Sequence, residues 1–286
     1  MPRRLADYDL EDWKRLRPLL QSYKTLRYNA VNRLHVRKPA RAGDAGAIAH
    51  AITGRRVLVT VAFNDPQATA WQIALMRRYV AHDVHLIADN SSDDAEAAAI
   101  AEVARSAGVP YLWLPASRTR SSRSHGLALN WLWRNVVRPG APEAFGFLDD
   151  DLFPTAPSDP FAPLAAQDFY GFVRTAGARW FLWAGYCMFR FAAVKDRPLD
   201  FRQDWFIGLD TGGGNWEVLY RHADLARLTM ASRIETPYRA DVPVSSGHIE
   251  WVEGWLHEVG DGGQPAVAED KRTRVAMMLE PHLEGE

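Results

Sequence analysis

The stretch that decides the fold is AFGFLDDDLFP, residues 144–154. Its first five residues carry no charge and are typical of a short strand buried in a core. Three carboxylates follow at Asp149–Asp151, where they repel one another and lose hydration. A cation or a proton offsets such a cost, and hard divalent cations, which also bind phosphates, are the usual choice. The alternative is an acidic turn that only ends a strand.

Composition narrows the class of protein. A length of 286 residues with 47% hydrophobic and 24% charged residues fits one large α/β domain, with or without extensions. The formal net charge of −1 argues against a nucleic-acid partner. The single cysteine, Cys187, excludes an intramolecular disulfide. No apolar run approaches the roughly 20 residues of a membrane span, and Met1–Arg4 leads into acidic residues. We therefore expect a cytoplasmic protein.

The N-terminal region differs from the rest of the chain. Up to Arg41 it holds 11 Lys and Arg against four acidic residues. Apolar residues recur at helical spacing, at Leu10, Trp13, Leu16, Leu20 and Tyr23. These features predict a basic helical extension over residues 1–54. It either makes peripheral contact with an anionic membrane surface or a partner, or packs on the main domain with its basic face in water.

From residue 55 the sequence alternates between strand and helix patterns. Apolar runs predict four strands, at 57–63, 84–88, 109–114 and 145–148. Helices are expected at 66–81, before Gly108 and at 124–137, the first capped by Asp65 with Pro66 as its first residue. Further strands are expected at 169–173 and 185–191, and a helix at about 215–229. This alternation predicts an α/β fold with a mostly parallel central sheet flanked by helices.

Polar residues follow several of the expected strands. They are Asn64, Asp89, the basic loop 118–123 and Asp149–Asp151. Ligands in such sheets bind at the carboxyl ends of the strands. Because these residues would meet at one edge, they predict a ligand site more strongly together than any of them alone.

In this order and at these intervals, several motifs resemble those of the GT-A glycosyltransferases, most nearly the family-2-like enzymes. The motifs are the strand end at Asn64, DNSSD at 89–93, GLALN at 126–130 and FLDDD at 147–151. The resemblance covers about residues 55–260, so we expect a GT-A domain at 55–263 and a C-terminal tail at 264–286. The family's acidic pair before the last helix is absent, and Asp210-Thr211-Gly212-Gly213 stands near its place.

The resemblance implies a nucleoside-diphosphate sugar as donor, with UDP as the first choice, and a saccharide or other hydroxyl as acceptor. It implies that Thr60, Ala62 and Asn64 line the base and ribose and that Asp89 accepts a hydrogen bond from the base. The DXD motif would be Asp149–Asp151, in which Asp149 and Asp150 contact the nucleotide. Asp151, with Asp149, would bind Mn²⁺ or Mg²⁺, which stabilises the leaving nucleoside diphosphate. It also implies a C-terminal histidine ligand, for which His257 is the first candidate and His248 the second.

Other candidate roles are argued from chemistry. An inverting transfer needs a base for the acceptor hydroxyl, and Asp210 beside a glycine run is the candidate, although a turn aspartate explains it nearly as well. The basic loop, through Arg118, Arg120 or Arg123, would neutralise the diphosphate or remain solvated. Four tryptophans would either form a platform for the acceptor or belong to the core. They are Trp180, Trp183, Trp216 and Trp251.

Three other classes of protein remain open at this point. A nucleotidyltransferase normally has a glycine-rich basic loop after the first strand, where this chain has Phe63-Asn64-Asp65-Pro66. A haloacid-dehalogenase-type phosphatase carries its nucleophile after the first strand of its domain, whereas the acidic triplet follows the fourth expected strand. A non-catalytic protein that binds a sugar or nucleotide is the third alternative.

Overall fold

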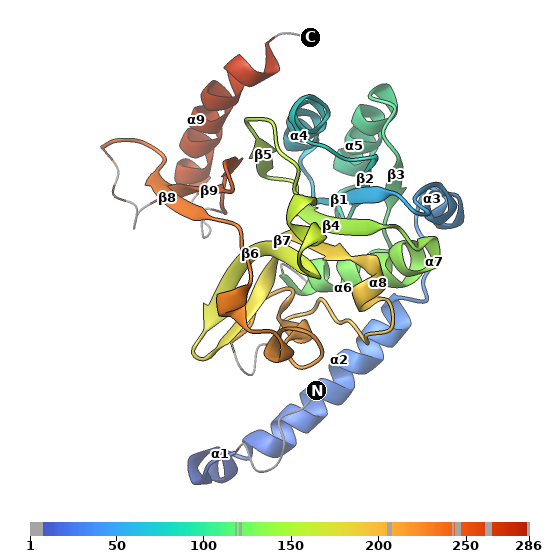
Figure 1. Ribbon diagram of the computed structural model, residues 1–286, viewed down its shortest axis with the longest axis vertical. Helices are drawn as coiled ribbons and strands as arrows, with labels where there is room; N and C mark the ends of the chain where they lie inside the picture. The colour runs from blue at the N-terminus through green and yellow to red at the C-terminus, as the bar shows by residue number, and fades with distance from the viewer. Residues whose placement is uncertain are drawn as a thin grey trace.

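The computed structural model describes residues 8–117, 119, 122–204, 208–241, 243, 247–260 and 265–284. A six-stranded sheet with the order β3-β2-β1-β4-β7-β6 forms its centre (Figure 1). The strands are β1 (Arg56–Ala62), β2 (Val84–Asp89), β3 (Tyr111–Trp113), β4 (Ala144–Asp149), β6 (Phe169–Ala176) and β7 (Arg179–Arg190). The first four are parallel to one another, and β7 and β6 are added antiparallel. The predicted mixed α/β fold is confirmed.

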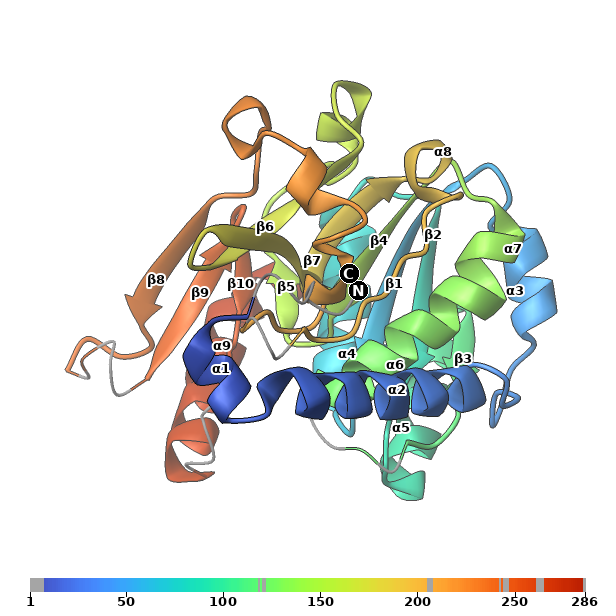
Figure 2. The ribbon, with the colours of Figure 1, turned by 90° about the horizontal axis from the view of Figure 1, so that it is seen from below.

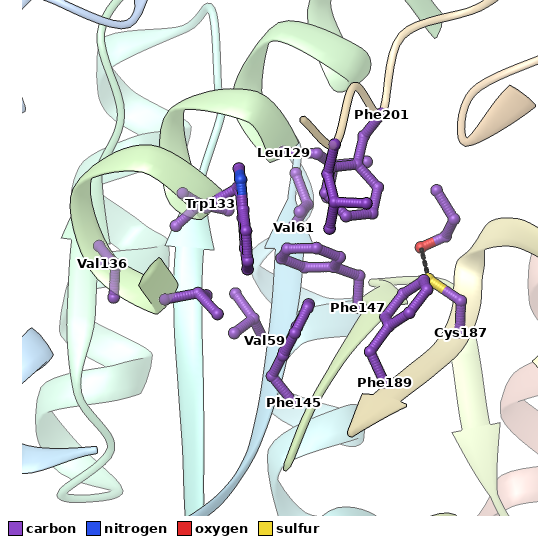
Figure 3. Packing of buried hydrophobic residues seen from close by; sticks show 14 of the residues in the cluster. Val59, Val61, Leu129, Trp133, Val136, Phe145, Phe147, Cys187, Phe189 and Phe201 are labelled. Carbon is purple, nitrogen blue, oxygen red and sulfur yellow. Dashed lines mark hydrogen bonds between the residues drawn. The ribbon is translucent and has the colours of Figure 1, made fainter. Parts of the chain in front are cut away.

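Helices connect the strands of the parallel half, and two of them begin at an aspartate cap, Asp65 or Asp93. The helices are α4 (Pro66–Tyr79), α5 (Asp94–Ser106), α6 (Ser122–Leu132) and α7 (Arg138–Gly140). Asp65 accepts from the backbone N–H of Ala68 and precedes Pro66 at the first helical position, as expected. A π-helical turn, Trp133–Val137, links α6 to α7. This turn packs Trp133 against Phe145, inside the core shown in Figure 3.

A second sheet, with the order β5-β10-β9-β8, stands beside the first. Its strands are antiparallel: β5 (Leu152–Pro154), β8 (Arg233–Pro237), β9 (His248–Val252) and β10 (Trp255–His257). The proline at position 154 therefore ends a short strand after the acidic triplet. The triplet forms the turn between the two sheets, because β4 belongs to one and β5 to the other.

Both ends of the chain are helical. The N-terminal helices are α1 (Leu10–Lys14), α2 (Arg17–His35) and α3 (Ala45–Ala51), and the C-terminal one is α9 (Pro265–Leu283). Figure 2 shows α2 as a long rod along the side of the body that carries α6. Ile52 is fully buried in the main core, and Val275 and Leu279 are fully buried against the second sheet. Packing is thus continuous across the boundaries expected at residues 54 and 264. None of the described helices is both long and apolar enough to cross a membrane.

The helix expected at about 215–229 is not formed. Three short 3₁₀ turns take its place, at Gly213–Asn215, Tyr220–His222 and Leu225–Arg227. Tyr220 is fully buried between Phe169 and Trp180. Tertiary packing of this ring outweighs the local helical pattern. The expected strand at 185–191 is also longer than predicted, because β7 takes in the aromatic run at 180–183.

Candidate functional site

A cavity of about 890 Å³ opens at the carboxyl ends of the parallel strands. Chain order reverses between β1 and β4, and ligands in open α/β sheets bind at such a switch point. The cavity is lined by Arg41, Val61, Phe63, Asn64, Asn90, Ser91, Ser92, Ala116, Ser117, Thr119, Ser124, His125, Asp149, Asp150, Asp151, Trp183, Asp210 and Thr211. The expected meeting of Asn64 with Asp149–Asp151 at one edge is therefore confirmed.

The acidic turn is held by neighbours from β1 and α4. Asp150 accepts a hydrogen bond from the backbone N–H of Phe63 at 2.7 Å, which ties the ends of β4 and β1 together. The Gln72 side-chain amide donates to the backbone oxygens of Asp149 (2.7 Å) and Leu152 (2.8 Å). These contacts fix the backbone on both sides of the turn, so its carboxylates have defined positions at the cavity wall.

Two imidazoles face the outer carboxylates of the turn. His125 Nε2, on α6, lies 3.4 Å from Asp149 Oδ1, and His257 Nε2, on β10, lies 3.4 Å from Asp151 Oδ1. Burial raises the pKa of Asp149 and raises that of Asp150 well above its usual value, with Asp151 adding to both. Burial would also raise the pKa of Asp151, but His257, a backbone hydrogen bond and Arg272 together outweigh it and the pKa is lowered. The turn thus concentrates negative charge that the protein only partly offsets.

His257 is fixed from behind. Its Nδ1 lies 3.0 Å from Glu250 Oε2 on β9, and its ring packs on Trp183 with centroids 4.7 Å apart. Burial would lower the pKa of His257, but Asp151 and Glu250 raise it to about 9. A carboxylate behind a histidine, with the other ring nitrogen aimed at an acidic oxygen, is the arrangement that orients metal-binding histidines.

The donor set at the turn fits a divalent cation. Asp151 Oδ1 and His125 Nε2 are buried and have no hydrogen-bond partner among the described residues. Asp151 Oδ1 and His257 Nε2 together offer an oxygen and an imidazole nitrogen, which Mn²⁺ accepts and which Mg²⁺, a harder ion, accepts less readily. Two protein ligands leave the other coordination positions to phosphate and water oxygens, as in sites that hold a metal together with its phosphate substrate.

A second acidic group lies on the smaller sheet. Glu235, His248 and Glu250 hold their ligand atoms within 4.8 Å of one another, the most compact such cluster in the described part of the chain. The guanidinium of Arg233 contacts both glutamates, with Nε 3.0 Å from Glu250 Oε1. Arg174 lies 3.9 Å from Glu250 Oε2. Because arginine already neutralises these carboxylates, the cluster is an ion-pair network. It includes His248, the second candidate ligand, whereas Asp149, Asp151 and His257 are spread more widely.

The structure corrects which side of β1 faces the cavity. Thr60 and Ala62 are fully buried, and Thr60 Oγ1 donates to Gln72 Oε1 at 2.5 Å, away from the cavity. Val61 and Phe63 line the cavity in their place. Successive side chains of a strand point to opposite faces, so Thr60 and Ala62 share the face that is turned away from the cavity.

Asn64 and Asp89 shape the loop after β2. Asn64 has a left-handed backbone (φ 52°), and its Oδ1 accepts from the backbone of Ser92 (3.0 Å) and Asp93 (3.2 Å). Asp89 is fully buried and accepts from the backbone of Ser91 and from the Tyr111 hydroxyl, both at 2.7 Å. Its carboxylate therefore holds the loop from behind. Direct contact of Asp89 with a base stays a prediction.

Of the remaining candidate residues, Asp210 and Trp183 line the cavity, whereas Trp216 and Arg123 do not. Asp210 lies at the cavity, and its Oδ1 accepts from the Gln203 amide at 2.7 Å and the backbone of Thr211 at 2.8 Å. Trp183 also reaches the cavity but is 8% exposed, and Trp216 packs against the main core. Arg123 lies over the Tyr28 ring and lines a different cavity, next to α2. Arg118 and Arg120 lie outside the described residues.

Sequence reasoning missed several residues of the site. Arg41 was counted only as part of the basic extension, yet it reaches the cavity with its guanidinium 3.6 Å from the Trp113 ring centroid. His125 could have been predicted from its position, since it directly precedes the GLALN segment at 126–130. Glu250 gave none, because its contact with His257 depends on the pairing of β9 with β10.

Comparisons with known proteins are distant. No family model matches the chain, and no curated protein does either. Among solved structures, the chain is similar to the mannosyltransferase PcManGT from Pyrobaculum calidifontis in complex with GDP-Man and Mn²⁺, at 14% identity and a TM-score of 0.41. The match covers 67% of this chain and 57% of that one, so this chain spans less than two thirds of the mannosyltransferase. An assignment of function has to come from the cavity itself.

Proposed function

We propose that this protein is a metal-dependent glycosyltransferase of the GT-A type, which uses a nucleoside-diphosphate sugar as donor. The observation that supports it is the fixed turn Asp149–Asp151, which lines the cavity at the switch point of the sheet and whose last carboxylate lies beside His257. A nucleotide sugar carries a diphosphate, and a divalent cation held by the acidic turn would offset the charge of that group. A cavity of about 890 Å³ also suits a ligand of this size.

In this proposal Asp151 and His257 hold Mn²⁺ or Mg²⁺, and Asp149 lies next to them toward the ribose. The ion would offset the charge that develops on the leaving nucleoside diphosphate. Glu250 is a positioning residue, since its carboxylate accepts from His257 and turns Nε2 toward Asp151. Asp150 keeps the turn attached to β1 through its bond with the backbone of Phe63.

The nucleoside would lie along the loop after β2 and the end of β1. Asn64, Ser91 and Ser92 present polar groups there, and the half-exposed ring of Phe63 offers an apolar face. Asp89 holds this loop in place by accepting a hydrogen bond from the backbone of Ser91. The structure favours no particular base, so UDP stays the first choice to be tested against the other diphosphates.

Asp210 is the candidate base for the acceptor hydroxyl. It lies on the cavity wall, where Gln203 and the backbone of Thr211 orient its Oδ1. A general base has to come within hydrogen-bond reach of the proton that it removes. The position of Asp210 at the cavity meets this condition for an acceptor that enters from the same opening, and transfer by a single displacement would invert the anomeric centre.

A thermal-shift screen tests this function directly. UDP, GDP, TDP and CDP are each added with and without Mn²⁺ to wild type and to Asp151→Ala. We expect one nucleotide to raise the melting temperature only when the metal is present, because a ligand of the native state stabilises it by mass action. Asp151→Ala should keep its fold, as judged by circular dichroism, and lose the shift.

The control is Glu102→Gln, which removes an exposed carboxylate that does not line the cavity. It should keep the metal-dependent shift in full. No shift with any pair in wild type, or a full shift in Asp151→Ala, would contradict the proposal. A matching assay for released products separates the neighbouring classes, since pyrophosphate from a nucleoside triphosphate would instead indicate a nucleotidyltransferase.

A further inference from the structure

The long helix α2 packs on the body through polar side chains. Arg202 donates to the backbone oxygen of Tyr28 at 2.6 Å and to Asn29 Oδ1 at 2.9 Å. Asn130 Nδ2 donates to Asn32 Oδ1 at 3.1 Å. An ordinary surface helix buries an apolar stripe and exposes its polar face, so the orientation of α2 is the reverse of the usual one.

The opposite side of α2 is apolar and exposed. Its large residues, which we call the outer face, are Leu19 (63% exposed), Leu20 (49%), Tyr23 (63%), Leu26 (70%), Val31 (37%) and Leu34 (65%). Leu10, Trp13 and Leu16 extend it into α1. Elsewhere in the described chain, large apolar side chains are exposed only at Phe63, Ile234 and Met277. An apolar patch of this extent marks an interaction surface.

The charge on α2 indicates what binds there. The helix contains no acidic residue, and its cations are Arg17, Lys24, Arg27 and Arg33. Arg27 follows Leu26 directly, and long basic side chains can extend past an apolar surface to place their charge at its polar boundary. A helix that combines leucines, aromatic residues and cations in this way is suited to the interface of an anionic bilayer.

We propose that the outer face of α2 docks in the plane of an anionic lipid bilayer. A second copy of this chain is a poorer occupant, because a symmetric pair would bring four cations of one helix against four of the other. The body then lies on the aqueous side, attached through the polar contacts of Arg202 and Asn130. This inference is independent of the reaction proposed for the cavity.

Vesicle flotation with the full-length protein tests the inference. The probes are vesicles of phosphatidylcholine alone and of phosphatidylcholine mixed with phosphatidylglycerol. We expect binding to the mixed vesicles only, weakened by salt. Arg27→Gln/Arg33→Gln should lower the partition coefficient roughly fivefold for each arginine removed. Leu19→Gln/Leu26→Gln should lower it by about tenfold or more, because both leucines would lose burial in the interface.

The matched control is Ile234→Gln/Met277→Gln, which removes two equally exposed apolar side chains elsewhere and should float like wild type. All three double variants change exposed positions, so their thermal unfolding should match that of wild type. Absence of wild-type flotation with anionic vesicles would overturn the inference. So would a concentration-dependent dimer in sedimentation that Leu19→Gln/Leu26→Gln dissolves, since a second copy would then cover the face.

Discussion

The acidic turn Asp149–Asp151 and the cluster of Glu235, His248 and Glu250 are similar in composition but differ in their partners. The cluster has arginines in contact, whereas the turn faces imidazoles and a cavity. Carboxylates beside a guanidinium are already neutralised, so they stabilise a fold without needing a ligand. Carboxylates at a cavity wall without such a partner are the better candidates for a metal, even though they are less compact.

The largest effect is expected for Glu250→Gln, which should weaken the binding of Mn²⁺ at the turn. Glu250 supports His257 from behind, and loss of such a second-layer carboxylate typically lowers metal affinity by about ten- to a hundredfold. Titration calorimetry with Mn²⁺ and the nucleotide found in the screen measures this affinity. A fall in affinity with unchanged nucleotide stoichiometry is the expected result.

The control for Glu250→Gln comes from the same cluster. Glu235 lies in that cluster and contacts Arg233 but not His257, so Glu235→Gln should leave the Mn²⁺ affinity unchanged. If Glu235→Gln or His248→Gln removed Mn²⁺ binding while Asp151→Ala kept it, the metal would belong to the cluster and the comparison would be reversed.

A smaller effect, on stability, is expected for Arg233→Gln. The Glu250 side chain is 1% exposed, so the loss of its main cationic partner leaves a buried charge only partly offset by Arg174 and His257. We expect the free energy of unfolding to fall by about 2 kcal/mol, below the usual cost of a broken buried pair because those partners remain. Urea unfolding measures the change.

Arg227→Gln is the matched control for Arg233→Gln. Its side chain is 85% exposed and pairs with Asp224, which is 60% exposed. Exposed ion pairs contribute little, so the change should stay below about 0.5 kcal/mol. Equal losses in the two variants would show that burial of Glu250 does not decide the strength of the cluster.

The parallel half of the fold was predictable because its strands are continuous apolar runs and α4 begins at a recognisable cap, Asp65. Because β1 is such a continuous apolar run, its sequence does not indicate which of its two faces is turned to the cavity. A strand buried on both sides has no polar alternation, so nothing local separates Thr60 from Val61. The helix expected after Asn215 was wrong because burial of Tyr220 is a tertiary effect.

The candidate site was predictable to the extent that chain order determines it. Asn64 and Asp149–Asp151 meet because both follow neighbouring parallel strands. Contacts between the two sheets, such as that of Glu250 with His257, depend on strand pairing that local patterns do not contain. Arg41 was missed for a similar reason, since the bridge between Ala42 and Trp113 brings the N-terminal segment to the cavity.

The effect that is smallest near neutral pH, and grows only in acid, concerns another buried group, His85, which lies beside a hydroxyl rather than a carboxylate. Its Nε2 lies 2.9 Å from Thr60 Oγ1, and burial lowers its pKa to about 3, whereas carboxylates raise the pKa of His257 to about 9. The unfolded chain therefore binds a proton at His85 below about pH 6.5 that the folded protein does not. The contribution of His85 to the free energy of unfolding is complete above that pH and falls by about 1.4 kcal/mol per unit as the pH drops toward 3.

Urea unfolding in EDTA at a series of pH values tests this pH dependence. The stability of His85→Gln should fall less steeply than that of wild type by about 1.4 kcal/mol per pH unit below pH 6.5, because glutamine does not titrate. His50→Gln, at an exposed position of α3, should keep the wild-type slope. Parallel curves for wild type and His85→Gln would mean that His85 accepts its proton in the folded state. The contrast between imidazoles with and without carboxylate partners would then fail.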